Sequence, residues 1–206
     1  LGTNISLGSE KSNVELVNSY NDTTYTAQLF IPADKDVTLA LNGNTISTEA
    51  TATYMVFNCG TLTVDGSVEG SSITAGVDAE TEGNASPRLF MNYAGTLTLN
   101  GGHYDGYYAV NNNVEDKSGA MPTGTIMIRN AEIVGGFSAL SNFTNGTITA
   151  NNTTIKAYYY GLVNNGTYGN TNFDITGGTI TSNADTAIYF PAGNKLTLTD
   201  VTVSAP

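Results

Sequence analysis

Apolar and polar residues alternate along most of the chain, in short runs that return at a regular interval. The related runs are DVTLALNG (36–43), CGTLTVDG (59–66), AGTLTLNG (94–101), TGTIMIRN (123–130), NGTITANN (145–152), NTNFDITG (170–177) and GNKLTLTD (193–200). Alternation with a period of two is typical of β-strands, and only a short stretch near residues 11–19 has a helical pattern. The pattern therefore predicts a repetitive, all-β chain.

The interval between the runs sets the size of one repeat. Taking the second apolar residue of each run as an anchor gives Leu41, Val64, Leu99, Ile128, Ala150, Ile175 and Leu198, and the shortest intervals between anchors are 22 and 23 residues. Repeats of this length indicate a solenoid. A second apolar column follows the anchors at Ile46, Ile73, Tyr104, Ile133, Ile155, Ile180 and Val203. A third lies at Val56, Phe90, Val110, Leu140, Leu162 and Ile188.

Three apolar columns predict three strands in each coil, and seven anchors suggest roughly seven coils. Residues 29–206 would form this solenoid, and residues 1–28 an N-terminal cap or an irregular segment. Two residues beyond the third column stand Asn58, Asn92, Asn112, Asn142 and Asn164. Buried amides at strand spacing can satisfy one another, so they predict an internal asparagine ladder. Glycines follow at 60, 95, 124, 146 and 166, where we expect a turn with positive φ.

These coils and the ladder resemble the right-handed parallel β-helix of the pectate-lyase-like kind. The stretch IPADKDVTLALNGNTI (31–46) is also similar to the first coil of β-helix repeats in large surface proteins, or adhesins, of gut Firmicutes. The resemblance implies the right-handedness of the coil, which spacing alone does not give. It specifies the fold rather than the function, because unrelated functions share such folds.

Charge and composition narrow the range of partners. Eighteen acidic residues against seven lysines and arginines give a net charge of −11, which disfavours nucleic acid and anionic membrane surfaces. The chain has no run of 18 apolar residues for direct membrane insertion, and its one cysteine, Cys59, excludes an internal disulfide. The final VTVSAP stops partway round a coil, so we expect either a piece of a longer chain with neighbouring domains or an end that meets a neighbouring molecule.

His103 is the single histidine, and it is a candidate for chemistry. Its register places it on the outer face beside Glu132 of the next coil, with Asp105 on the same face. Two carboxylates could make the imidazole a general acid or base, or could themselves act as a glycosidase pair. The alternative is a solvated cross-strand pair at a position where other coils carry threonine. Motifs of polygalacturonases, such as Asn-Thr-Asp and Gly-His-Gly, are missing from the sequence.

Aromatic residues recur just before the third strand in three consecutive coils. Tyr107, Phe137 and Tyr159 should stack in one column, with Tyr108 and Tyr160 beside it. Partly exposed tyrosine rings suit sugars or protein partners, although the same rings could only pack a corner. Outward threonines at 61, 63, 96, 98, 147 and 149 form a Thr-x-Thr array that resembles ice-binding faces, with Met127 and Asp174 interrupting it.

Two longer loops, 77–88 and 113–123, interrupt the repeat, and loops on a rigid scaffold often carry function. Asp78, Glu80 and Glu82 alternate in the first loop, as ligands of Ca²⁺ can, but the full EF-hand pattern is missing, and a solvated loop is the alternative. We expect no cofactor and no dedicated metal site. The sequence thus favours a non-catalytic, secreted or cell-surface bacterial module that contacts glycans or a host surface protein. A glycan-degrading enzyme domain, using His103, Asp105 and Glu132, is the alternative.

Overall fold

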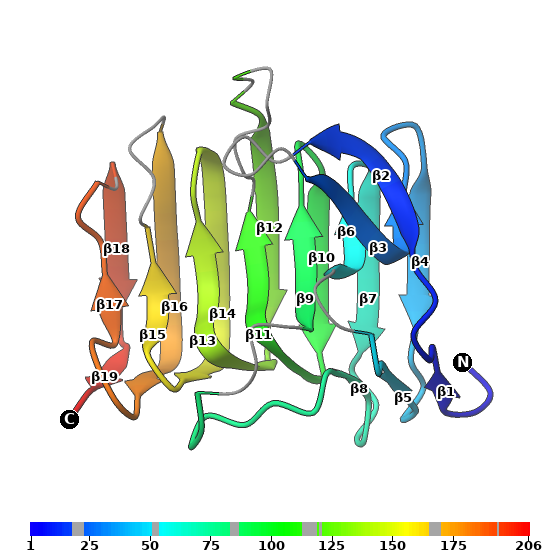
Figure 1. Ribbon diagram of the computed structural model, residues 1–206. Helices are drawn as coiled ribbons and strands as arrows, with labels where there is room; N and C mark the ends of the chain where they lie inside the picture. The colour runs from blue at the N-terminus through cyan, green and yellow to red at the C-terminus, as the bar shows by residue number, and fades with distance from the viewer. Residues whose placement is uncertain are drawn as a thin grey trace.

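The chain folds into a parallel β-solenoid of about six turns, in which no helix occurs among the described residues. The computed structural model describes residues 1–17, 23–50, 54–82, 87–112, 119, 121–164, 170–192 and 194–206. Successive coils stack side by side, and the two termini lie at opposite ends of the stack (Figure 1). The predicted all-β parallel solenoid is confirmed, while its right-handedness stays a prediction from the resemblance.

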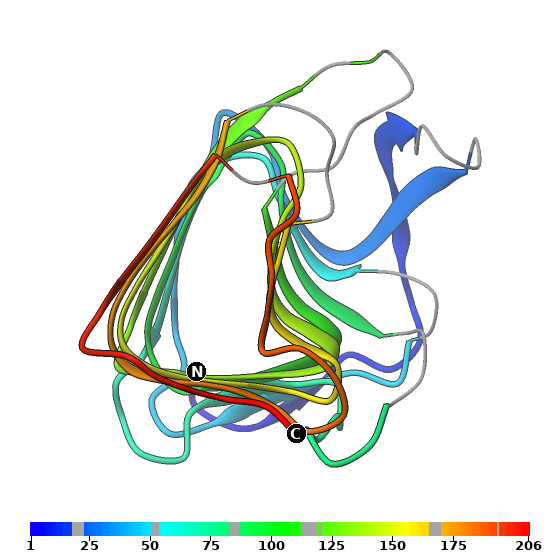
Figure 2. The ribbon, with the colours of Figure 1, turned by 90° about the vertical axis from the view of Figure 1, so that its left-hand side faces the viewer.

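Each coil contributes to three sheets, which form the sides of a tube when the molecule is seen along the stack (Figure 2). The first sheet contains β4 (Asp36–Ala40), β7 (Thr61–Gly66), β10 (Thr96–Gly101), β12 (Thr123–Arg129), the first half of β14 (Asn145–Ala157), the first half of β16 (Thr171–Ser182) and β18 (Lys195–Thr199). All of these strands pair in parallel, as consecutive coils of one solenoid must.

The second sheet contains β1 (Ile5–Ser6), β5 (Thr45–Ser47), β8 (Ser72–Thr74), the beginnings of β11 (His103–Asn112) and β13 (Glu132–Asn142), the ends of β14 and β16, and β19 (Thr202–Ser204). The third contains β3 (Thr24–Ile31), β6 (Tyr54–Asn58), β9 (Arg88–Asn92), the ends of β11 and β13, β15 (Tyr160–Val163) and β17 (Ile188–Tyr189). Strands β11 and β13 therefore bend from the second sheet into the third.

The apolar columns fill the tube. Cα pairing joins all seven predicted positions of the second column and all six of the third, coil by coil. The first anchor was misplaced, because Leu39, not Leu41, pairs with Val64. Leu41 is buried, but it lies past the end of β4, at a turn two residues longer than those that follow β10 and β12. The coil count of roughly seven was also too high, since seven stacked anchors enclose only six intervals.

The asparagine ladder is present in the core. The side-chain amide of Asn58 donates to Asn92 (2.7 Å), that of Asn92 to Asn112 (3.0 Å) and that of Asn112 to Asn142 (3.3 Å). Asn164 differs, because its amide donates to the backbone carbonyl of Asn142 and to the hydroxyl of Thr171. The ladder thus satisfies the buried amides from Asn58 to Asn142 between the third and first sheets, whereas the side-chain oxygen of Asn164 has no hydrogen-bond partner among the described residues.

The glycines after the ladder are needed for close packing rather than for positive φ. Among the described ones only Gly146 has a positive φ, of 136°; Gly166 lies outside the described residues. A Cβ on Gly60 would lie 2.3 Å from the carbonyl oxygen of Pro32, and one on Gly95 2.6 Å from that of Gly60. The backbone of the preceding coil occupies the space that a side chain would need, so the expectation of positive φ was wrong here.

The described part of residues 1–28, without 18–22, forms strands at the N-terminal end. Leu1, Ile5 and Leu7 pack against the core, and β2 (Ser12–Val17) pairs in antiparallel fashion with β3. Val14 is buried while Asn13 and Glu15 are exposed, which is the period of a strand. The helical pattern near 11–19 was therefore misleading over its described part. A second cluster, built from β2, β3 and the outer face of β6 and β9, includes Val14, Tyr25, Tyr54, Phe57, Met91 and Tyr93.

Candidate functional site

His103 lies on the outer face of the second sheet, in register with Glu132 as predicted. Its Nδ1 is 2.9 Å from a carboxylate oxygen of Glu132, and its Nε2 is 3.2 Å from one of Asp105. Lys156, one coil further, donates to the other oxygen of Glu132 at 2.7 Å. Lys156 was not among the residues predicted for the site, although its place two residues after Thr154 puts it in the column that contains Asp105 and Val134. These four side chains form one charged network.

Asp105 is buried, with 2% of its surface exposed, because the loop 75–82 passes over it. We call this loop the strap. The second carboxylate oxygen of Asp105 accepts the backbone N–H groups of Ala75 (3.0 Å) and Val77 (2.7 Å). Farther along the strap, the side-chain amide of Asn183, the residue after β16, donates to the carbonyl of Ala79. Asp105 was expected on the outer face with His103, and it does point there. Its carboxylate is covered by the strap and holds it by accepting hydrogen bonds from it.

The pKa of each of the three candidate groups is shifted in the direction that favours its charged form. The hydrogen bond to Asp105 is the largest cause of a raised pKa at His103, assisted by Glu132 against the effect of burial. Burial alone would raise the pKa of Asp105, but hydrogen bonds from His103, Thr74 and the Val77 N–H lower it. The Lys156 hydrogen bond lowers the pKa of Glu132. Neither carboxyl therefore has the raised pKa that the general acid of a glycosidase needs.

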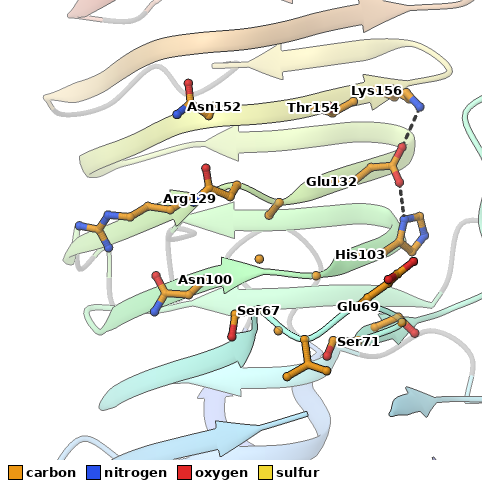
Figure 3. A pocket seen from close by; sticks show the side chains of 18 residues that line it. Ser67, Glu69, Ser71, Asn100, His103, Arg129, Glu132, Asn152, Thr154 and Lys156 are labelled. Atoms are coloured by element: carbon orange, nitrogen blue, oxygen red, sulfur yellow. Dashed lines mark hydrogen bonds and ion pairs between the residues drawn. The ribbon is translucent and has the colours of Figure 1, made fainter. Parts of the chain in front are cut away.

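A polar groove of about 970 Å³ lies over this network (Figure 3). One wall is the turn around Ser67–Ser71, and the floor includes Gly101 and Gly102. Arg129 lies at the end away from His103, where Figure 3 shows its side chain directed outward. A second hollow, of about 530 Å³, continues between the strap and the sheet and shares His103, Glu132 and Lys156. The three residues thus form the common floor of a trough across the second sheet.

The predicted aromatic column is present on the third sheet. We use that name for Tyr107, Tyr108, Phe137, Tyr159 and Tyr160, all of which are half-buried. The ring of Phe137 lies 5.7 and 5.0 Å from those of Tyr107 and Tyr108, and 5.6 and 5.3 Å from those of Tyr159 and Tyr160. Tyr108 and Tyr160 both pair with Ser138, which leaves Tyr107, Phe137 and Tyr159 equivalent in their coils. The rings are both packed together and partly open to solvent.

Charged groups that the sequence did not connect with the column flank it. The Arg88 guanidinium lies 4.9 Å from the ring centre of Tyr108 and 5.6 Å from that of Tyr54. At the other end, the hydroxyl of Tyr160 donates to Asp185 at 3.2 Å. Glu82, at the end of the strap, lies beside Tyr107 and Tyr159, where burial and this carboxylate raise the pKa of both phenols. The strap therefore borders the trough on one side and the column on the other.

The acidic residues of the strap do not gather into a metal site. Asp78 accepts hydrogen bonds from the backbone N–H groups of Glu80 and Thr81 and from the Thr81 hydroxyl. Asp78, Glu80 and Glu82 form no group that could hold a metal ion, and the rest of the described chain contains no cluster of three such ligands either. Asp78 instead closes a turn of the strap. Most of the loop 113–123 lies outside the described residues.

The threonine array lies on the outer face of the first sheet. Pairing aligns Thr61, Thr96, Thr125 and Thr147 in one column, and Thr63, Thr98, Met127 and Thr149 in the next. Asp174 follows Thr149, as expected.

The described residues contain no helix long and apolar enough to cross a membrane.

The charged network makes a prediction about pH. Because the pKa of His103 is raised in the fold, its contribution to stability is complete below its unfolded pKa of about 6.5 and is lost as pH rises through the folded value. The side chain is 40% exposed, so the contribution should be less than about 1 kcal/mol. Because His103 is the single histidine of the chain, its NMR titration can be assigned without ambiguity. Replacing Glu132 with glutamine should lower the measured pKa of His103. An unchanged pKa would contradict the pairing.

Comparisons with known proteins found no match to this chain. No protein-family model matches the chain, and no significant match is found among curated proteins or among solved structures.

Proposed function

We propose that this chain is a non-catalytic binding module of an extracellular bacterial surface protein, and that the aromatic column is its contact surface for glycans. The column is the observation that carries the proposal. It presents five half-buried rings on one rigid sheet, spanning three coils. Rings held in place by packing lose little conformational entropy when a ligand covers them, and their faces suit the apolar faces of sugars.

Several features of the chain support a surface module. The solenoid is a stack of parallel coils without an internal disulfide, and the net charge of −11 disfavours nucleic acid and anionic membranes. We extend the proposal to the kind of scaffold, a right-handed β-helix of the pectate-lyase-like kind, similar to the repeats of adhesins from gut Firmicutes. A host surface protein is the other partner that such a module could contact.

A glycan array tests the proposal. Replacing Tyr107 and Tyr159 together with alanine should abolish binding to the glycans that the parent protein retains, or weaken it about thirtyfold, because central aromatic anchors dominate such contacts. The matched control is Phe30→Ala, since Phe30 is 43% exposed near the N-terminal end and outside the column. Circular dichroism should show the same strand content in all three proteins. If the double variant and the parent protein retain the same glycans equally well, the aromatic column is not the glycan contact surface.

A glycan-active enzyme is the second candidate, favoured by the trough that contains His103 and Glu132. Both carboxyl groups near His103 have lowered pKa values and bonded partners, which argues against a glycosidase acid. Chromatography of array-positive glycans after incubation distinguishes the two functions. Release of shorter products by the parent protein, but not by a His103→Gln, Asp105→Asn, Glu132→Gln triple variant, would overturn the non-catalytic proposal.

A further inference from the structure

We propose that the two end faces of the solenoid bind each other, so that a second copy of this chain stacks head to tail on the first. The inference goes beyond the proposed function, because it uses neither the aromatic column nor the trough. One end face is formed by β1, β3 and β4, and the other by β17, β18 and β19, at opposite ends of the stack (Figure 1). We call them the N-face and the C-face.

Each end face carries strand edges that have no strand partner among the described residues. On the C-face, β17 pairs with β15, and β18 and β19 pair with β16, so each is paired along one edge. On the N-face, β1 pairs with β5 and β4 with β7. The outer edge of β3 is covered by β2 from Thr24 to Ala27, and no described strand covers Leu29–Ile31. Open edges present backbone N–H and C=O groups that a further strand can pair with.

The register of the stack carries over from the C-face to the N-face. Pairing from coil to coil puts apolar residues of the two faces in the same column, once in each sheet. These are Leu198 and Leu39 in the first sheet, Val203 and Ile5 in the second, and Ile188 and Leu29 in the third. A second copy placed one coil beyond the C-face would therefore continue all three columns.

Both faces expose apolar surface that such a contact would cover. Leu198 and Val203 of the C-face are 38% and 44% exposed, which is unusual for apolar residues of this chain. On the N-face, an apolar hollow of about 190 Å³ has Leu29, Ile31 and Leu39 in its wall. Leu198 of the neighbouring copy would lie over Leu39, beside this hollow. Removing these apolar groups from water favours association of the faces.

One pair of charges is complementary across the two faces. Lys195, at the start of β18, lies in the column that begins with Asp36 of β4. Both side chains are exposed, and neither takes part in an ion pair of the described residues. Head-to-tail stacking would make them direct neighbours on adjacent strands. Contact between two C-faces or two N-faces lacks this pair, so the charges favour the head-to-tail arrangement.

The net charge of the chain acts against the contact at long range, because two copies that each carry −11 repel one another. Salt screens this repulsion, since the Debye length falls from about 30 Å at about 0.01 M to about 8 Å at about 0.15 M ionic strength. Association should therefore be stronger at about 0.15 M salt than at about 0.01 M.

Sedimentation velocity over a series of protein concentrations tests the inference. A face that binds a different face does not close after two copies, so the mean mass of the parent should rise with concentration beyond that of a dimer. Asp36→Lys and Lys195→Glu should each weaken association about tenfold, because each brings like charges together. Asp174→Lys is the matched control for Asp36→Lys, since Asp174 is exposed on the interior strand β16, and it should associate as the parent does.

Mixing the two end-face variants identifies the head-to-tail arrangement. Asp36→Lys keeps a native C-face and Lys195→Glu keeps a native N-face, so every junction between the two variants joins opposite charges. The equimolar mixture should associate as the parent does, and circular dichroism should show the same strand content in all variants. A mixture that associates no better than its components would overturn the inference.

Two other results would also overturn it. A parent that stays monomeric at every concentration would mean that a different partner covers the faces. Equal association of the parent and both end-face variants would place the contact elsewhere on the surface. The double replacement of Tyr107 and Tyr159 by alanine should leave association unchanged, so stacking and glycan binding are tested independently.

Discussion

Replacing Asn92 with alanine is expected to lower the free energy of unfolding by about 3 kcal/mol, because the ladder is buried and each member depends on its neighbours. Asn92 is fully buried, accepts the amide of Asn58 and donates to the side-chain oxygen of Asn112 and to the carbonyl of Gly95. Alanine leaves the Asn112 oxygen without that donor and opens a cavity where the amide was. Both effects act at a place that water does not reach.

Urea denaturation measures the free energy of unfolding of Asn92→Ala, with Asn172→Ala as the matched control. Asn172 is a half-buried asparagine on the outer face of β16, so its replacement should change the unfolding free energy by less than about 0.5 kcal/mol. Because repeat proteins can unfold in parts, the midpoint should be followed by fluorescence and by circular dichroism. Similar midpoints for the two variants would show that the ladder contributes little.

Period and register were readable from the sequence because a stacked coil repeats its side-chain directions. Two of the three apolar columns and the asparagines from 58 to 142 follow from counting alone, since each coil has to align with the last. The errors lie where the repeat is imperfect. Leu41 matched the apolar pattern, but a wider first turn moved the paired position to Leu39. The role of Gly60 depends on the carbonyl of Pro32 in the preceding coil, which no local pattern reports.

The site was predictable to the same extent. Stacking of His103 on Glu132, and of Tyr107 on Phe137 and Tyr159, follows from register. The path of the strap does not, because it is an insertion that leaves the repeat and crosses several coils before it reaches Asn183. The burial of Asp105 and the position of Glu82 beside the column both depend on that path. The features of the site that the sequence did not predict therefore lie where a loop returns to the scaffold.

Replacing Asp105 with alanine is expected to release the strap and to lower the free energy of unfolding by about 3 kcal/mol. The Val77 N–H loses its acceptor, and the Ala75 N–H keeps only its bond to the backbone carbonyl of residue 105. His103 loses one of its two carboxylates. Hydrogen exchange should accelerate at residues 75–82 more than in the sheets, because the sheets keep their own pairing. Asp105→Asn retains an oxygen that can accept from the strap and should recover part of the loss.

The pH dependence of this effect identifies the charge as its cause. The folded pKa of Asp105 is lowered, so its contribution is complete above the unfolded pKa of about 3.9 and is lost as pH falls through the folded value. The stability difference between the parent and Asp105→Asn should therefore be largest near neutral pH and shrink on acidification below about pH 4. A difference in stability that does not vary with pH would mean that Asp105 acts through its shape alone.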